Sequence, residues 1–237
     1  MTKRNGTWMR KAFDLIMPRA CIACGDRLTT TERYLCANCS RHLPRTFYEL
    51  TPSSNAMTDC FMHLLSLEKC VALLYHHPSN ESAQMVYAMK YSRQRKIGIW
   101  LGELLAKEIK DAGFFDGIDV IVPIPLTRSR EEERGYNQSL LLAEGITHHV
   151  AIPIANDAVE RVTFRGSQTQ KDRWERNQNV HESFKLKNPN LLKGKNVLII
   201  DDVVTTGATV IACGNEILKA APRSISLLAL SFAGSQM

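Results

Sequence analysis

Apolar and polar positions follow a regular alternation of strand and helix over most of the chain. Short apolar runs have the pattern of buried strands at residues 69–75, 119–125, 195–204 and 224–232. Helical spacing lies between or after them, at residues 81–91, 97–113, 137–150 and 210–221. Because parallel strands are joined by helices of this length, the pattern predicts an α/β fold whose central parallel sheet is flanked by helices.

The beginning of the chain departs from this alternation. Apolar residues at positions 9, 12, 13 and 16 predict a short amphipathic helix. The polar, turn-rich residues 51–58 predict a linker. We therefore expect two domains, an N-terminal module at 1–55 and an α/β domain at 60–237.

Composition narrows the class of protein. The chain has 237 residues, of which 44% are hydrophobic and 23% charged, as in ordinary globular domains. No apolar run approaches the ~18–20 residues that cross a bilayer, so we expect no membrane span. Arg10, Lys11 and Asp14 interrupt the first apolar stretch, which does not fit a signal peptide. Together with the odd count of seven cysteines, this favours a cytoplasmic location.

The net charge of +6 is concentrated near the N-terminus. The first fifty residues contain nine basic and four acidic side chains, an excess of five. Such a basic module suits nucleic acid or another acidic partner. A solvated basic face has the same composition and is the simpler alternative.

Four of the seven cysteines form two Cys-x2-Cys pairs, at Cys21, Cys24, Cys36 and Cys39. Zinc prefers soft or borderline ligands at four tetrahedral corners, and two such pairs fill that shell. The spacing therefore predicts a structural Zn²⁺ in a small zinc-ribbon or knuckle module, because no corner is left open for water. A redox pair, an iron–sulfur site and a module without metal are the alternatives.

The strand at 195–204 runs into two adjacent carboxylates, Asp201 and Asp202, and then into the sequence TTGAT. A helix start offers unpaired backbone N–H groups and a positive dipole end, which favour a phosphate, and Gly207 lets the backbone approach it. The carboxylates repel phosphate but can accept hydrogen bonds from a sugar diol. The segment predicts a ribose 5-phosphate ligand. The alternative is an acidic strand end before a helix capped by threonine.

This block resembles the phosphoribosyl-pyrophosphate (PRPP) motif of type I phosphoribosyltransferases. Two further segments, VPIPL at 122–126 and RGYNQ at 134–138, resemble the VPVPL and RGFNQ signatures of the ComF/GntX family. That family is linked to competence and DNA uptake, and the four-cysteine module resembles its N-terminal zinc module. Tyr136 stands where phenylalanine is more usual, and Arg165 where the family's later run has threonine.

The resemblance implies a type I phosphoribosyltransferase-like fold and a role for each matching residue. It places Asp201 and Asp202 on the ribose hydroxyls in the catalytic site. It places the 5′-phosphate on a loop formed by Thr205, Thr206, Gly207, Ala208 and Thr209. It implies that arginines contact the pyrophosphate or line a mobile loop at 163–178; the candidates are Arg128, Arg130, Arg134, Arg161 and Arg176. The dense charge of pyrophosphate implies Mg²⁺ that arrives with the substrate.

Three functions remain open at this point. The first is an active phosphoribosyltransferase that transfers ribose 5-phosphate from PRPP to an unknown acceptor. The second is a PRPP- or nucleotide-sensing protein without turnover, and the third is an adaptor that contacts DNA or a DNA-uptake helicase or ATPase. A homodimer is a further expectation. The histidines are candidate general bases by residue type only, at His76, His77, His148, His149 and His181.

Overall fold

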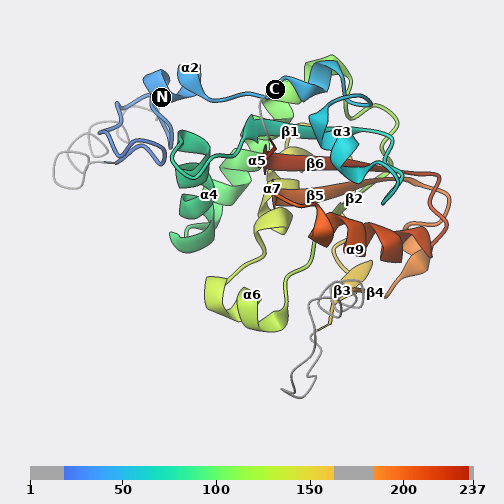
Figure 1. Ribbon diagram of the computed structural model, residues 1–237. Coiled ribbons are helices and arrows are strands. Elements are labelled where there is room, and N and C mark those ends of the chain that lie inside the picture. Colours follow the sequence, from blue (N-terminus) through green and yellow to red (C-terminus); the bar gives the residue numbers. More distant parts are fainter. Residues whose placement is uncertain (1–18, 163–183, 235–237) are drawn as a thin grey trace, which may run out of the picture.

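The computed structural model describes residues 19–162 and 184–234 (Figure 1). The predicted helix at positions 9–16 lies outside the described residues, as does the predicted loop at 163–178 with Arg176. In the part of the chain that is described, no helix has both the length and the apolar character that a membrane crossing requires.

A parallel sheet with the strand order β1-β6-β5-β2 lies at the centre of the fold. Its strands are β1 (Cys70–Tyr75), β2 (Val120–Pro123), β5 (Asn196–Val204) and β6 (Ser224–Phe232). Of the two inner strands, β6 is buried except at its first residue, and β5 is buried except at its first residue and at Asp202 and Val203. Burial on both faces explains their continuous apolar runs, and the predicted parallel sheet is confirmed.

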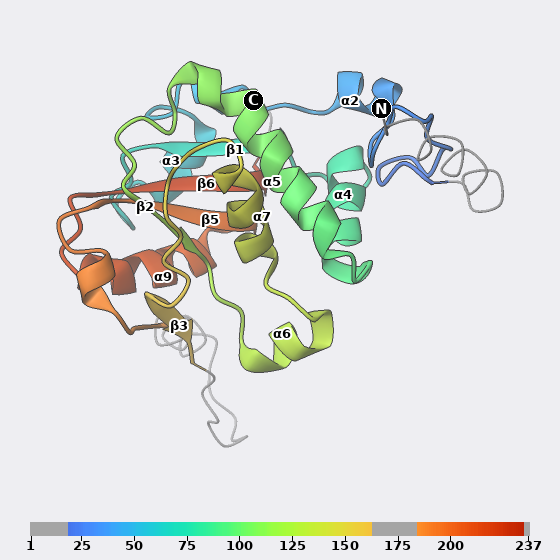
Figure 2. The same ribbon diagram turned by 180° about the vertical axis from the view of Figure 1, so that it is seen from behind.

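Helices cover both faces of this sheet. They are α3 (Ala56–Phe61), α5 (Arg95–Ile109), α7 (Gln138–Thr147) and α9 (Ala208–Leu218). α5 and α7 lie on one face, and α3 and α9 lie on the other (Figures 1 and 2). α5 and α7 cross with their backbones in contact, because a Cβ atom on Gly102 would lie 2.1 Å from the carbonyl oxygen of Leu142. Any side chain at position 102 would push the two helices apart.

The remaining elements are short or lie outside the main layers. A small antiparallel sheet consists of β3 (Val159–Arg161) and β4 (Phe184–Leu186). The other helices are α2 (Ala37–His42), α4 (Glu81–Tyr91) and α6 (Arg128–Arg134). Single 3₁₀ turns are η1 (Tyr48–Leu50), η2 (Lys110–Ala112) and η3 (Pro189–Leu191). α4 matches the predicted helix at 81–91, and its N-terminal cap is Asn80, whose side chain accepts a hydrogen bond from the N–H of Ala83.

The prediction of a linker at 51–58 is wrong, because helix α3 begins inside it. Asn55 and Thr58 form a reciprocal capping box at the start of this helix. Met57 and Phe61 then point into the core and are almost completely buried. The polar residues that suggested a flexible segment are therefore the cap of a short, docked helix.

Residues 44–46 cover the outer edge of β1. Arg45 forms an antiparallel bridge with Leu74, and the N–H of Tyr75 donates to the carbonyl of Pro44 at 2.8 Å. The guanidinium of Arg45 also donates two hydrogen bonds of 2.8 Å to the carboxylate of Glu108 on α5. An uncovered parallel edge strand presents unpaired backbone groups to other chains, so this segment protects the sheet.

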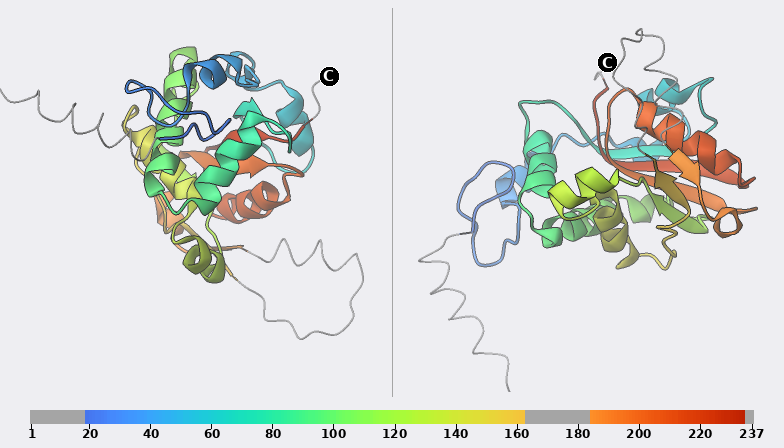
Figure 3. Two further views of the ribbon diagram at one scale, coloured as in Figure 1. Left: turned by 90° about the vertical axis from the view of Figure 1, so that its left-hand side faces the viewer. Right: turned by 90° about the horizontal axis from the view of Figure 1, so that it is seen from below.

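The cysteine module, residues 19–43, lies beside α4 and α5 and away from the sheet (Figures 2 and 3). The rings of Tyr34 and Trp100 pack with centroids 5.4 Å apart, and Arg33 forms an ion pair of 3.4 Å with Glu103. The contact between module and body therefore uses α5 rather than the strands.

The two-domain division at 1–55 and 60–237 stays a prediction, and the packing of residues 44–61 moves the boundary that we propose to residue 44. A chain that begins at Pro44 keeps the covered β1 edge and α3, so we expect it to be soluble and to unfold cooperatively. A chain that begins at Asp59 loses both and should aggregate. Circular dichroism melting and gel filtration of the two truncations check this. Equal behaviour of both would show that residues 44–58 contribute nothing to the fold.

Candidate functional site

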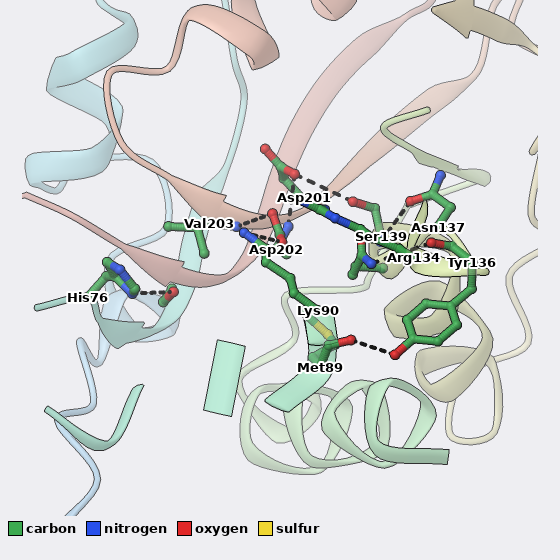
Figure 4. Close-up of polar contacts among 12 residues, drawn as sticks. His76, Met89, Lys90, Arg134, Tyr136, Asn137, Ser139, Asp201, Asp202 and Val203 are labelled. Atoms are coloured by element: carbon green, nitrogen blue, oxygen red, sulfur yellow. Dashed lines mark hydrogen bonds and ion pairs between the residues drawn. The ribbon is translucent and has the colours of Figure 1, made fainter. Parts of the chain in front are cut away.

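The predicted acidic pair lies at the carboxyl end of β5 (Figure 4). Asp201 is only 8% exposed, and its Oδ1 accepts hydrogen bonds from the Ser139 hydroxyl at 3.4 Å and from the Asp202 backbone N–H at 2.9 Å. Asp202 is more accessible, and its Oδ1 accepts from the N–H of Val203 at 2.8 Å. The two carboxylates are thus held by local hydrogen bonds at the edge where parallel sheets bind ligands.

Burial, followed by the neighbouring charge of Asp202, raises the pKa of Asp201 to about 8. In an unfolded chain the same carboxyl titrates near ~4. Between these two values the folded protein binds more protons than the unfolded chain, so ionising Asp201 lowers the folding stability as the pH rises. A carboxyl that is kept in place despite this cost suits a ligand-binding role.

Lys90 balances the second carboxylate. Its Nζ lies 2.8 Å from Oδ2 of Asp202, and both side chains are mostly shielded from solvent. Lys90 belongs to the last turn of α4, so this ion pair joins α4 to the end of β5. The sequence did not indicate this pairing, because Lys90 and Asp202 lie far apart along the chain.

The predicted phosphate loop, Thr205–Thr209, follows the end of β5 and leads into α9. Thr205 and Thr206 are exposed, and Gly207 adopts φ +74° at the start of α9. A Cβ atom on Gly207 would lie 2.7 Å from Cε1 of Phe61, so α3 packs directly beneath the loop. Gly207 therefore meets two requirements, a left-handed backbone and room for Phe61. The first N–H groups of α9 face a site beside exposed hydroxyls, an arrangement that binds anions.

Side chains of the RGYNQ segment form hydrogen bonds to α4 and to the residue that follows β2. Tyr136 donates its hydroxyl to the carbonyl of Met89 at 2.8 Å, next to Lys90 on α4. Asn137 donates its Nδ2 to the carbonyl of Ile124 at 3.0 Å, and its side chain also caps α7. The tyrosine that replaces the more usual phenylalanine thus gains a hydrogen bond. Tyr136 and Asn137 thus connect α7 to α4 and to the chain that follows β2.

The predicted arginines are not all equally placed. Arg134, at the end of α6, donates to Oε1 of Gln138 at 2.8 Å and lies over the Tyr91 ring. Arg128 is an exposed side chain that pairs with Glu132 along α6 at 3.0 Å. Arg134 is therefore next to the site, whereas Arg128 faces solvent.

Arg161 approaches the acidic pair from β3. Its guanidinium lies 5.1 Å from the centre of the Phe184 ring. Burial, and then the nearby charge of Arg130, lower the pKa of Arg161, while the charge of Asp201 opposes that shift. Arg161 thus lies within electrostatic range of both Arg130 and Asp201.

The four cysteines of the module converge. The sulfur atoms of Cys21, Cys24, Cys36 and Cys39 all lie within 4.8 Å of one another. The Cys24 and Cys36 sulfurs are 3.9 Å apart, close to the ~3.8 Å edge of a tetrahedron with Zn–S bonds of ~2.3 Å. Backbone N–H groups of Cys36 and Cys39 donate to the sulfurs of Cys21 and Cys36, each at 3.4 Å.

The four thiols differ in acidity: the pKa of Cys24 is raised to about 11 and that of Cys39 is raised as well, whereas that of Cys21 is lowered. Burial raises the pKa of the Cys21 thiol, but backbone N–H groups from Cys24, Cys36 and Ala23 outweigh it and lower the pKa to about 7. Thiolates are the form that binds Zn²⁺. The convergence of the four sulfur atoms is the observation that fits a four-thiolate structural zinc site.

Comparisons with known proteins agree with this geometry. Residues 90–236 match the phosphoribosyl transferase domain family. Competence protein F of Haemophilus influenzae is 29% identical over 209 residues, 84% of this chain and 89% of that protein. The DNA utilization protein YhgH of Escherichia coli K12 is 30% identical over 202 residues, 84% of each chain. Competence protein ComFC of Bacillus subtilis is 44% identical over 94 residues, 38% of this chain and 34% of that protein.

The parallel sheet with flanking helices, the acidic strand end and the threonine loop define a type I phosphoribosyltransferase fold. The domain match and the relatives aligned over 84% of the chain go further: the chain belongs to the ComF family of phosphoribosyl transferase domain proteins, with a four-cysteine module at its N-terminal end. The resemblance stated from the sequence is confirmed at the level of family and fold.

We expect purified protein to contain about one zinc per chain, measured by elemental analysis. Cys36→Ser should lose the metal and lower the melting temperature of the module, because one thiolate corner is removed. Cys60→Ser is the matched control, since Cys60 is exposed and lies outside the cluster. Protein without zinc whose four thiols titrate freely would contradict the assignment.

Proposed function

We propose that this protein binds PRPP, or a related ribose 5-phosphate ligand, together with Mg²⁺. The observation that carries the proposal is the placement of Asp201 and Asp202 beside the Thr205–Thr209 loop at the end of one strand. A loop of open N–H groups and hydroxyls is suited to a phosphate, and adjacent carboxylates are suited to a diol. Only a ligand that carries both groups a few bonds apart uses the whole arrangement.

Several basic side chains near the acidic pair favour a ligand that carries a second anionic group besides its 5′-phosphate. Lys90 of α4 pairs with Asp202, and Arg134 at the end of α6 lies beside the acidic pair (Figure 4). Arg161 of β3 is within electrostatic range of Asp201 and of Arg130. In this binding mode they face the pyrophosphate, and guanidinium groups pair well with phosphate oxygens. The Mg²⁺ would be carried mainly by the pyrophosphate oxygens and water, as is usual for this ion.

Transfer from PRPP breaks the bond between C1 of ribose and the pyrophosphate oxygen and forms a bond from C1 to the acceptor. Positive charge develops on the ribose ring, and in this binding mode the negative charge of Asp202 stabilises it. The alternative is a sensing protein that binds the same ligand without turnover. Release of pyrophosphate in the presence of a panel of bases and amines separates the two.

The names of the relatives, a competence protein and a DNA utilization protein, supply the biological setting for the proposal, a role in competence or DNA use. One surface suits single-stranded DNA. The Tyr87 and Tyr91 rings are exposed on α4 with centroids 4.8 Å apart, and exposed Arg93, Arg95 and Lys96 follow them. Single-stranded nucleic acids bind where aromatic side chains stack on bases beside a basic track.

For this second candidate function we expect the full chain to bind an oligo-dT probe with an affinity that falls steeply with salt. Replacing Tyr87 and Tyr91 by alanine should weaken binding by about 5- to 150-fold per stacked base, from ~1–3 kcal/mol each. Leu64→Ala removes an equally exposed apolar side chain elsewhere and is the control. Unchanged affinity in the tyrosine variant would exclude this surface.

The central proposal is tested by changing both carboxylates. The Asp201→Asn/Asp202→Asn variant should bind PRPP far more weakly, because a charge-assisted hydrogen bond to the ionised Asp202 contributes on the order of 1.5–3 kcal/mol, roughly 10- to 150-fold, and the acceptor oxygen of Asp201 is altered as well. Its affinity for inorganic phosphate should change little, since that ligand uses only the loop. Calorimetry with both ligands measures the difference.

The matched control removes two charges at the opposite edge of the sheet. Glu68→Gln/Asp111→Asn changes exposed acids before β1 and after α5, and it should leave both affinities unchanged. A melting curve shows whether each variant is folded. If the folded double-asparagine variant binds PRPP as tightly as the parent chain, the acids do not hold a ribose diol.

A further inference from the structure

His76 stands one residue beyond β1, at the same carboxyl edge of the sheet as the acidic pair. Its backbone N–H donates to the carbonyl of Phe232 at 2.7 Å and so extends the pairing of β1 with β6. Its ring Nδ1 lies 3.4 Å from the hydroxyl of Ser231 on β6. These two contacts hold the backbone and the imidazole ring of His76 against β6.

The strand order separates two sides of the site. β2 lies on one side of β5 and leads into α6 with its arginines, while β6 and then β1 lie on the other side. Figure 4 shows the same division, with Asp202 and Lys90 between His76 on one side and Arg134 on the other. In the proposed binding mode, the pyrophosphate leaves toward the arginines. A nucleophile that displaces it must approach C1 from the opposite side, which is the side of His76.

The surroundings of His76 favour a neutral ring. Burial, and next the charge of Lys90 on α4, lower its pKa below the ordinary histidine value. His77 acts in the same direction, and Asp202 on β5 acts against it. Ser231 on β6 is uncharged. A neutral imidazole that donates Nδ1–H to the serine hydroxyl carries its lone pair on Nε2, free to accept a proton.

We propose that His76 is the general base on the acceptor side of the site and that it serves an acceptor whose attacking atom is an N–H or O–H group. This rests on the proposed binding of PRPP. The acceptor atom forms a bond to C1, the bond from C1 to pyrophosphate breaks, and pyrophosphate leaves with the electron pair. The acceptor's proton passes to Nε2 of His76, so charge and atoms balance.

The other polar side chains at the carboxyl end of the sheet have different roles in the proposed binding mode. Asp201 and Asp202 face the ribose diol, and Lys90 is a cation paired with Asp202. Thr205 and Thr206 of the loop carry hydroxyls, which do not take up protons at neutral pH. Among the described side chains around the acidic pair, His76 therefore has the right chemistry on the acceptor side.

The test compares two adjacent histidines in the full-length protein. His76→Asn removes the base, while His77→Asn changes an exposed neighbour whose Nδ1 contacts Ser79 at 2.8 Å. Calorimetry first measures PRPP affinity with Mg²⁺. Pyrophosphate release is then followed from pH 5 to 9 with water and with a panel of purine and pyrimidine bases as acceptors.

We expect both variants to bind PRPP as the parent chain does. In the parent and in His77→Asn, the rate of pyrophosphate release should increase with pH, with the midpoint of the increase below ~6.5, where His76 loses its proton. In His76→Asn this increase with pH should disappear, and the rate of pyrophosphate release should fall by about 10²- to 10⁴-fold. Added imidazole should restore part of the rate in a His76→Gly variant.

The outcomes separate this inference from the proposed function. A parent chain that does not bind PRPP contradicts the proposed function itself. A parent chain that binds PRPP but releases no pyrophosphate with any acceptor overturns the role of His76. The role of His76 is also overturned if the rate of His76→Asn still rises with pH below ~6.5, as the parent's does. It is overturned as well if His76→Asn loses no more rate than His77→Asn.

Discussion

Two adjacent carboxylates at the buried end of β5 are the constraint around which the site is arranged. Asp201 and Asp202 repel each other, and burial makes the ionised form of Asp201 costly. The surrounding elements compensate. Ser139 of α7 donates to Asp201, and Lys90 of α4 pairs with Asp202. α4 and α7 must both be docked correctly before the pair is tolerated, so the site and the fold depend on each other.

The RGYNQ segment provides that docking. Tyr136 joins the loop before α7 to α4 one residue from Lys90, and Asn137 joins it to the chain just after β2. On the other face, Phe61 of α3 packs against Gly207 and supports the phosphate loop from below. The residues with the most distinctive sequence are thus mostly those that hold elements together, and fewer of them reach the proposed ligand.

The sequence predicted the parts of this arrangement that depend on local pattern. The strands, the main helices, the cysteine cluster and the position of the acidic pair follow from apolar periodicity and spacing. It failed where polar residues serve packing, as at Asn55 and Thr58, which cap a docked helix in the supposed linker. It also could not pair Lys90 with Asp202, because that contact forms only when distant segments of the chain meet.

The measurement that tests the account most directly is a crystal structure of the protein with PRPP and Mg²⁺. We predict the 5′-phosphate on the N–H groups of the Thr205–Thr209 loop, the ribose hydroxyls on Asp201 and Asp202, and the pyrophosphate toward Arg130, Arg134 and Arg161. A ligand bound with its phosphates on the other side of β5, or at a site away from the carboxyl end of the sheet, would contradict the account.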